Sequence, residues 1–274
     1  MKTILLFTLI ALCVQNTVSQ VTSVVPSSAS VAGAEVADYS LYSAFANPAS
    51  LTSFTRPAMG IGYEQRFGLQ SLASKSVFVA FPSQLLHTAV NSSFFGNQSY
   101  NEWLMAIVLA RNFGPLHFGV QFNYLSVYFG EWKRRFGLLI PQIGAQVELS
   151  ESVIVGFSTF NPTQLQLKSE QSVKTISSIF AMGFRWNASD NFKTLVQLDK
   201  ILDGNYRIAG GFDYCIKNFL SVSTGIEYNE YLVPELGVGL HYRWFSFRLR
   251  TSLHPLFGIS NSAFVSLSLV DSKK

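Results

Sequence analysis

The sequence has little charge and, beyond its first residues, no long apolar run. Asp, Glu, Lys and Arg make up 13% of its 274 residues, whereas 48% are hydrophobic. After residue 14, no apolar run approaches the roughly 18 residues that a membrane-spanning helix needs. These features exclude a disordered chain and a helical membrane protein. A chain that is apolar on average but never apolar for long fits a transmembrane β-barrel, whose strands alternate lipid-facing and lumen-facing residues.

Cysteine and net charge are also scarce. An apolar stretch over residues 4–14, followed by small residues ahead of Gln20, predicts a cleaved signal peptide over residues 1–19. Cys13 lies within that stretch, so Cys215 is the one cysteine expected after processing, and no internal disulfide is expected. The net charge of +4 is too small to indicate a nucleic-acid partner.

Residues 20–56 differ from everything that follows. They are rich in Ser and Ala and show little alternation, so they are not predicted to form strands. A short helix is expected around Tyr39 to Phe45. It should stop at Asn47-Pro48, because proline disfavours the helical conformation in the residue before it.

From residue 57 to residue 270 the pattern has a period of two. Met59, Ile61 and Tyr63, for example, alternate with smaller or polar residues, and similar segments recur to the end of this range. About fourteen such segments are expected. The predicted fold is therefore all-β: a transmembrane, antiparallel, up-and-down β-barrel over residues 57–270, with a C-terminal tail over residues 271–274.

The connections between strands support a multi-pass protein of the bacterial outer membrane. Short turns such as Pro82-Ser83 and Lys217-Asn218 alternate with longer gaps, of which Ser126 to Arg135 and Asn161 to Val173 are the longest. Outer-membrane barrels have this asymmetry, with short periplasmic turns and long outer loops. The alternative is a soluble secreted β-sandwich, but its outward face should be polar, whereas here the bulkier face is apolar in strand after strand.

The segment before the strands resembles the N-terminal hatch of the FadL-like superfamily of outer-membrane barrels. The resemblance rests on Gly33-Ala34 to Asp38 and on a motif that comprises Asn47, Pro48, Ala49, Leu51 and Phe54. The hairpin formed by residues 110–124, together with Asn161-Pro162-Thr163, is more similar to the PorV/PorQ-type barrels associated with type IX secretion. The resemblance to the FadL-like superfamily implies a hatch over residues 20–56 that lies inside a fourteen-stranded barrel.

Two functions follow from the resemblance. The first is a non-enzymatic accessory or binding barrel of type IX secretion, which engages secretion-system proteins through its outer loops. The alternative is FadL-like passive transport of a small hydrophobic ligand, with the hatch as a gate. The first is favoured at this stage because a charged lumen is poor lining for an apolar ligand.

The lumen-facing positions are predicted to be polar and of mixed charge. Opposite charges inside a small barrel most often pair with each other, and the alternative is that they line a substrate path. Ten inward glycines, including Gly119 and Gly144, would let a bulky element such as the hatch pack against the wall. The predicted lumen-facing polar residues are Glu64, Arg66, Glu148, Arg185, Arg207, Asp213, Glu227, Glu235, Arg248 and Arg250.

Catalytic and metal chemistry find little support in the sequence. No local signature joins the four histidines, His87, His117, His241 and His254, to a nucleophile or to metal-ligand spacing, so neither an enzyme nor a cofactor is predicted. The basic run Trp132 to Arg135 could contact lipopolysaccharide phosphates or a secreted partner, and a solvated loop is the simpler interpretation. Outer-membrane lipid and lipopolysaccharide are the expected surroundings.

Overall fold

The computed structural model describes residues 25, 29–131, 133–168, 173–202 and 204–268. The predicted signal peptide, residues 269–270 of the predicted barrel and the C-terminal tail lie outside the described residues. None of the helices in the described ranges is long and apolar enough to cross a membrane.

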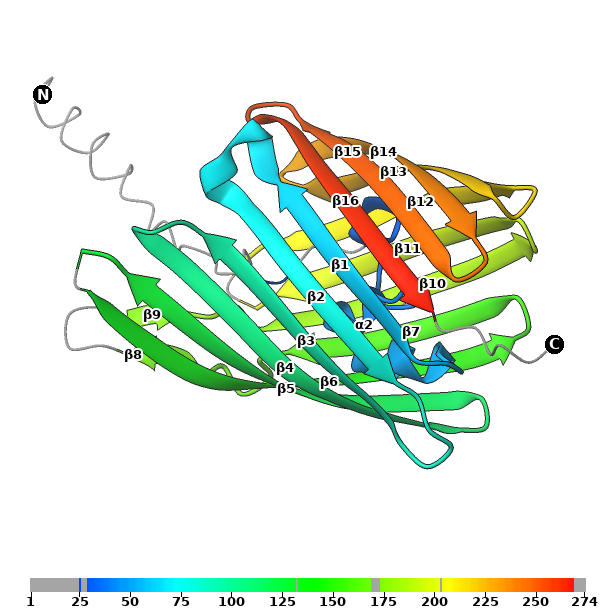
Figure 1. Ribbon diagram of the computed structural model, residues 1–274, viewed down its shortest axis with the longest axis horizontal. Helices are drawn as coiled ribbons and strands as arrows, with labels where there is room; N and C mark the ends of the chain where they lie inside the picture. Colours follow the sequence, from blue (N-terminus) through cyan, green and yellow to red (C-terminus); the bar gives the residue numbers. More distant parts are fainter. Residues whose placement is uncertain (1–24, 26–28, 132, 169–172, 203, 269–274) are drawn as a thin grey trace, which may run out of the picture.

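Fourteen of the sixteen described strands form one closed antiparallel barrel (Figure 1), as the alternation predicts. Each strand pairs with its neighbours in sequence, and β1 closes the barrel against β16 from Ala58 opposite Ser268 to Gln65 opposite Asn261. The strands are β1 (Ala58–Gln65), β2 (Ala73–Phe81), β3 (His87–Gly96), β4 (Tyr100–Phe113), β5 (Leu116–Phe129), β6 (Arg134–Ser150), β7 (Val153–Phe160), β10 (Ile179–Ser189), β11 (Phe192–Ile201), β12 (Tyr206–Ile216), β13 (Leu220–Asn229), β14 (Tyr231–Tyr242), β15 (Phe245–His254) and β16 (Gly258–Ser268).

The connections alternate in length only in part: the one from β2 to β3 (residues 82–86) is longer than the one from β3 to β4 (residues 97–99), and the one from β13 to β14 is Glu230 alone. We call the end that carries the connections after β1, β3, β5 and β7 the outer end, and the opposite end the inner end. The predicted loop Ser126 to Arg135 is shorter than expected, because β5 runs to Phe129 and β6 begins at Arg134. The connection from β7 to β10 is longer than expected and contains a small hairpin of β8 (Gln166–Lys168) and β9 (Val173–Thr175).

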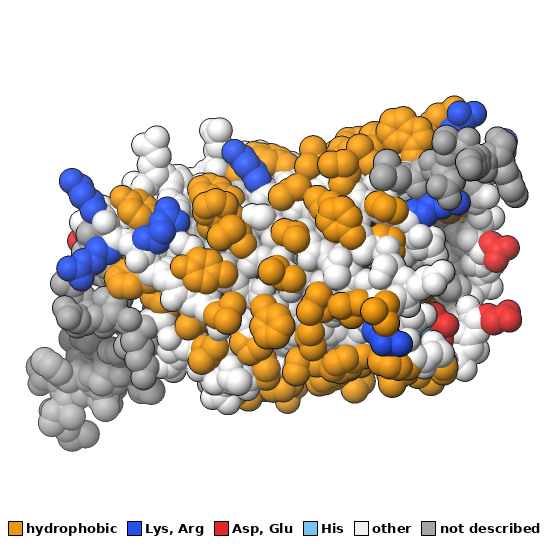
Figure 2. Space-filling model, turned by 60° about the horizontal axis from the view of Figure 1, so that its bottom comes forward, with side chains coloured by type: hydrophobic (Ala, Val, Ile, Leu, Met, Phe, Trp, Pro, Cys, Tyr) orange, Lys and Arg blue, Asp and Glu red, His pale blue; other side chains and the backbone are white. Residues whose placement is uncertain are grey.

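The outward face of the barrel is apolar. Ile107, Phe122, Met182 and Leu236 are among many large apolar side chains with exposed outer surfaces. Figure 2 shows such side chains spread over one face, while charged side chains gather toward the two ends. A soluble protein would not expose so continuous an apolar surface. The protein is therefore an integral, multi-pass barrel of the outer membrane.

The inward face surrounds the segment before β1, which we call the hatch (residues 29–56). Its elements are the 3₁₀-helix η1 (Val31–Gly33), the α-helix α2 (Ser43–Ala46), the 3₁₀-helix η2 (Pro48–Ser53) and the turns between them. Leu41, Phe45 and Leu51 of the hatch form a buried apolar cluster with Phe78 and Val108 of the wall. Packed apolar side chains therefore join the hatch to β2 and β4 inside the barrel.

Candidate functional site

The helix predicted in the hatch is shorter and begins later than expected, and two 3₁₀-helices accompany it. A helix was expected around Tyr39 to Phe45, but α2 spans only Ser43–Ala46, and the unexpected η2 follows directly at Pro48. At the C-terminal end of α2, a wall side chain satisfies backbone carbonyl groups. Gln142 Nε2 donates to the carbonyl oxygens of Phe45 and Ala46 at 3.0 and 2.9 Å. The barrel therefore satisfies part of the hatch backbone at the end of this helix.

Two further wall amides hold the turn before α2. Gln197 Oε1 accepts hydrogen bonds from the backbone N–H groups of Glu35 and Val36, at 2.7 and 2.9 Å. Gln146 Nε2 donates to the carbonyl oxygen of Val36 at 2.9 Å. Because these bonds join segments more than 100 residues apart, they fix the hatch to the barrel rather than to itself.

The Asn47-Pro48-Ala49 motif forms a latch between the hatch and β6. Asn47 is fully buried, and its Oδ1 accepts from the Ala49 N–H at 3.1 Å, which caps η2. Its Nδ2 donates to the carbonyl oxygens of Val36 at 2.6 Å and Ala145 at 3.2 Å. The motif residues Ala49 and Leu51 are buried and Phe54 packs against the same apolar cluster, so the predicted motif residues act together as a structural unit.

Seven of the ten predicted inward glycines lie where the hatch touches the wall, whereas Gly62, Gly237 and Gly239 face wall residues. A Cβ atom at Gly119 would lie 2.5 Å from the backbone carbon of Pro48 and 2.6 Å from the backbone nitrogen of Ala49. One at Gly156 would lie 2.1 Å from the carbonyl oxygen of Val36. Only a glycine leaves room for the hatch backbone at these positions.

We expect Gly119→Ala to loosen the hatch. The added methyl group meets hatch backbone, which cannot rotate away as a side chain can, and overpacking of this kind costs about 1–3 kcal/mol. Single-channel recordings in planar bilayers should show more frequent openings than in the unmodified protein. Gly210→Ala is the control, because its nearest neighbour would be 3.2 Å away. Equal opening frequency in both variants would contradict the close packing at Gly119.

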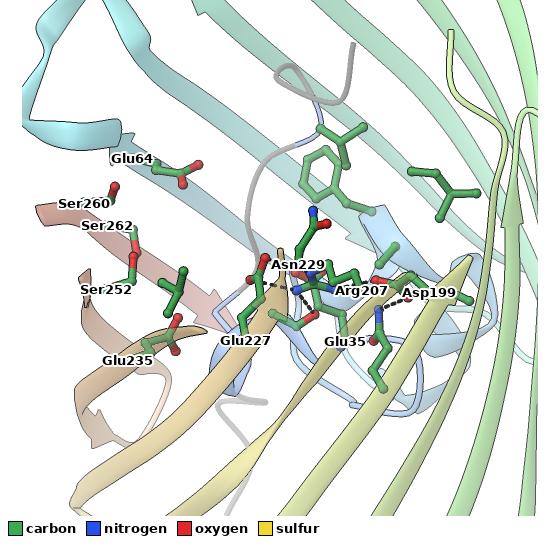
Figure 3. Close-up of a pocket in the computed structure, with 18 of the residues that line it drawn as sticks. Glu35, Glu64, Asp199, Arg207, Glu227, Asn229, Glu235, Ser252, Ser260 and Ser262 are labelled. Carbon is green, nitrogen blue, oxygen red and sulfur yellow. Dashed lines mark hydrogen bonds and ion pairs between the residues drawn. The ribbon is translucent and has the colours of Figure 1, made fainter. Parts of the chain in front are cut away.

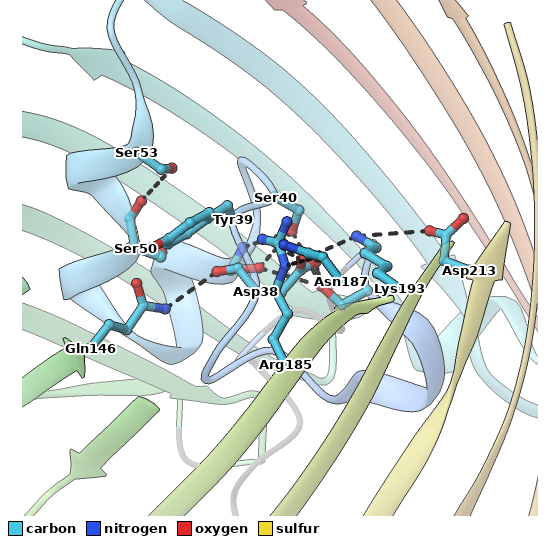
Figure 4. A network of polar contacts seen from close by, with 12 residues as sticks. Asp38, Tyr39, Ser40, Ser50, Ser53, Gln146, Arg185, Asn187, Lys193 and Asp213 are labelled. Atoms are coloured by element: carbon cyan, nitrogen blue, oxygen red, sulfur yellow. Dashed lines mark hydrogen bonds and ion pairs between the residues drawn. The ribbon is translucent and has the colours of Figure 1, made fainter. Parts of the chain in front are cut away.

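Asp38 of the hatch is the centre of a charge network near the inner end (Figure 4). Its carboxylate accepts from Lys193 Nζ at 3.1 Å and from the Ser30 hydroxyl at 2.5 Å, and Arg185 lies 3.6 Å away. Burial alone would raise the pKa of Asp38, but the two cations and the hydroxyl hold it well below its ordinary value. The carboxylate is therefore charged, and it ties the hatch to β10 and β11.

The other predicted lumen charges lie in pairs on the wall. Arg207 contacts Asp199 at 2.5 Å and Glu227 at 3.1 Å, and its guanidinium also donates to the carbonyl oxygens of Ala32 and Gly33 in the hatch. Further pairs are Arg248 with Asp213 at 2.8 Å, Arg250 with Glu235 through Nε and Oε1 at 2.8 Å, and Arg66 with Glu64 at 3.3 Å. The structure thus contains paired lumen charges, the alternative that the sequence analysis favoured over unpaired charges lining a substrate path.

Sequence reasoning missed three members of these networks, Asp38, Lys193 and Asp199. Lys193 and Asp199 lie at inward positions of β11, a strand whose alternation between Phe192 and Ile201 was readable in the sequence. Asp38 had no such signal, because its partners lie about 150 residues further along the chain.

Above the hatch, at the outer end, the lumen widens into a cavity of about 420 Å³, which we call the outer chamber (Figure 3). Its floor is formed by hatch residues, including Gly33, Glu35 and Val36. One part of its wall is apolar, and the rest is lined by uncharged polar side chains and by the paired charges of Arg207 and Arg250. The apolar lining residues are Val25, Val36, Phe45, Ala46, Phe67, Phe160, Ile179, Ala181, Ile201 and Val233.

One histidine lies in an arrangement that enzymes also use. Thr52 Oγ1 is 2.6 Å from His117 Nδ1, and His117 Nε2 is 3.2 Å from Glu148 Oε1. A hydroxyl, an imidazole and a carboxylate in this order resemble a catalytic triad. However, Thr52 and His117 are buried, and none of the three lines the outer chamber. Because Glu148 also accepts from Tyr39 at 2.8 Å, the trio joins the hatch to the wall.

The other three histidines are not part of this trio, although His87 is near enough to His117 to interact with it electrostatically. His87 begins β3 and His241 lies near the inner end of β14, whereas His254 ends β15 at the outer end. Among the described residues, no group of three or more His, Cys, Asp and Glu is placed to hold a metal ion.

Comparisons with known proteins identify the fold. No protein-family model and no curated sequence matches the chain. The toluene transporter TodX of Pseudomonas putida matches with a TM-score of 0.63 and 8% identity, covering 87% of this chain and 95% of TodX. The CymD monoaromatic hydrocarbon channel matches at 0.59 and 10% identity, covering 85% and 94%. Omp33 of Acinetobacter baumannii matches at 0.51 and 7%, covering 78% and 98%.

These similarities support the expected FadL-like fold, and at such low identities they establish the fold alone. The similar structures are channels and transporters rather than enzymes. None of them bears on the PorV/PorQ family or on type IX secretion, so that role stays a prediction. The same holds for contacts with lipopolysaccharide.

Proposed function

We propose that the protein is a passive outer-membrane channel for a small hydrophobic molecule, with the hatch as its gate. The observation that carries this proposal is the outer chamber, which lies at the outer end and is closed below by the hatch. A cavity of about 420 Å³ has the size of sites that hold small molecules. The similar fold of a toluene transporter and of a monoaromatic hydrocarbon channel supports it.

The charged lining is compatible with an uncharged ligand. Arg207, Arg250 and Arg66 each face a carboxylate partner, so their charges are neutralised within the wall. The apolar part of the chamber is then free to contact the ligand. A carboxylate ligand, by contrast, would have to displace one of these internal partners.

Uptake of a hydrophobic dye by whole cells tests the proposal, because the lipopolysaccharide layer slows such molecules. Cells that carry the protein should take up N-phenyl-1-naphthylamine faster than cells that lack it. Ala181→Trp should abolish the gain, because Ala181 is buried and lines the chamber.

The matched control is Met182→Trp, which places the same bulk on the exposed outward face of β10. That variant should take up the dye like the unmodified protein. If Ala181→Trp leaves uptake unchanged while the protein is folded in the membrane, the ligand does not pass through the chamber, and the proposal fails.

A further inference from the structure

We propose that the outer chamber takes small aromatic molecules that carry a hydroxyl or amino group, and that an aromatic rim at its mouth is their first binding site. This inference rests on the proposed function and names the class of ligand. The aromatic rim consists of Phe67, Tyr231, His254 and Phe257, which lie in or directly beside three separate outer connections of the barrel.

The rings of the rim form one continuous set of contacts. His254 and Phe257 stack with centroids 4.7 Å apart, and Phe67 lies 5.0 Å from Phe257 and 5.8 Å from His254. Tyr231 lies 5.2 Å from His254 on the other side. Phe67 and His254 also line the outer chamber, so the rim and the chamber are continuous.

The rim leaves ring surface open. Phe257 is 60% exposed and Tyr231 is 38% exposed. Part of each ring is therefore open to contact with a ligand. A flat aromatic ligand fits this surface, because offset or edge contacts between rings at 4.5–7 Å are favourable beyond the area that they bury.

Phe67 has a backbone conformation that bulky residues rarely adopt. Its φ of 55° lies in the left-handed region, which is unusual for a bulky residue. The Phe67 N–H donates to the Ser260 hydroxyl at 3.0 Å, which holds it there. His254 is held as well, since its Nδ1 accepts from the N–H groups of Leu256 and Phe257 at 3.2 and 3.3 Å. Unfavourable backbone conformations of this kind cluster at functional sites, where they fix the position of a side chain.

Below the rim, the chamber presents hydrogen-bonding groups rather than a purely apolar surface. The hydroxyls of Ser252 and Ser262 face the cavity, with Glu64 beside them and Asn261 on the same strand as Ser262 (Figure 3). An unsubstituted hydrocarbon would strip water from these groups and return no hydrogen bond, which is costly. A hydroxyl or amino group on the ring would replace that water.

The size of the chamber agrees with this class of ligand. A cavity of about 150 Å³ is enough for benzene, so about 420 Å³ accommodates a substituted ring. Because the guanidinium groups of the lining are already paired with carboxylates, a neutral polar substituent suits it better than an acid.

Equilibrium binding of p-cresol and toluene to the purified full chain tests the inference, because the two molecules differ only by a hydroxyl group. We expect p-cresol to bind about fivefold more tightly. The double variant Ser252→Ala with Ser262→Ala should remove this preference. Phe67→Asn, which tolerates the left-handed backbone but lacks the ring, and Phe257→Ala should each weaken p-cresol binding roughly 2- to 10-fold.

Leu256→Ala is the matched control, because Leu256 is equally exposed in the same turn and has no ring. Folding of every variant is checked by heat-modifiable migration in gels. Equal binding of toluene and p-cresol, no binding of either, or rim variants that behave like Leu256→Ala would each overturn the inference. The proposed function is judged separately by dye uptake with Ala181→Trp, so the failure of one is distinguishable from the failure of the other.

Discussion

Deletion of residues 21–50 is expected to convert a nearly silent barrel into one that conducts ions steadily. The deletion removes η1, α2 and the Asn47-Pro48-Ala49 latch, which together close the lumen. The barrel should still fold, because all fourteen strands pair with one another and β1 closes on β16 without help from the hatch. Water would then solvate Gln142, Gln146 and Gln197, whose hydrogen bonds to the hatch are lost.

Single-channel recordings in planar bilayers measure this effect directly. The unmodified protein should show rare, brief openings, whereas the truncated protein should show long ones of uniform size. If the unmodified protein already conducts steadily and the truncation changes nothing, residues 21–50 do not form a gate.

The second large effect is expected from arginine on the outward face. Val120, Phe122, Ile226 and Leu240 all face outward, and Ile226 lies well within β13 with about half of its surface exposed. Arginine facing lipid near the midplane costs roughly 2–4 kcal/mol, because its charge must leave water. Ile226→Arg should therefore shift the urea midpoint for unfolding in lipid vesicles to a markedly lower concentration.

The control for Ile226→Arg must be an arginine at a lumen-facing position with room for its side chain. Gln121 and Gln146 face inward but are fully packed, so arginine at either would test overpacking instead. Asn229 lies on the same strand as Ile226 and lines the outer chamber, so Asn229→Arg should be close to neutral. Equal destabilisation by both substitutions would contradict the assignment of the two faces.

The barrel was predictable from the sequence because its determinants are local. Alternation along single strands fixes which side chains face lipid, and Ile107, Phe122 and Leu236 are exposed on the outward face as their positions predict. The inward glycines also predicted where a bulky element would pack. The ends of strands were harder, since β5 and β6 extend past the expected loop from Ser126 to Arg135.

The site was less predictable because it depends on contacts across the lumen. The helix expected around Tyr39 to Phe45 is limited to α2, and hydrogen bonds to Gln142, Gln146 and Gln197, which lie far along the sequence, hold the backbone before it and at its end. The outer chamber likewise draws its lining from both ends of the sequence, and no single stretch signals it. The alternation of residues along the sequence carries no information about contacts between the hatch and distant strands.

The central claim is that ligand passes through the lumen only when the hatch moves, and a reversible cross-link tests it most directly. A Cβ atom at Gly183 would lie 3.3 Å from the Cβ of Ala37, close to the separation found in disulfides. Ala37→Cys with Gly183→Cys, in a Cys215→Ser background that removes the remaining described cysteine, joins the hatch to β10. Dye uptake should stop when the pair is oxidised and return when it is reduced. Uptake that is the same in both states would contradict the account.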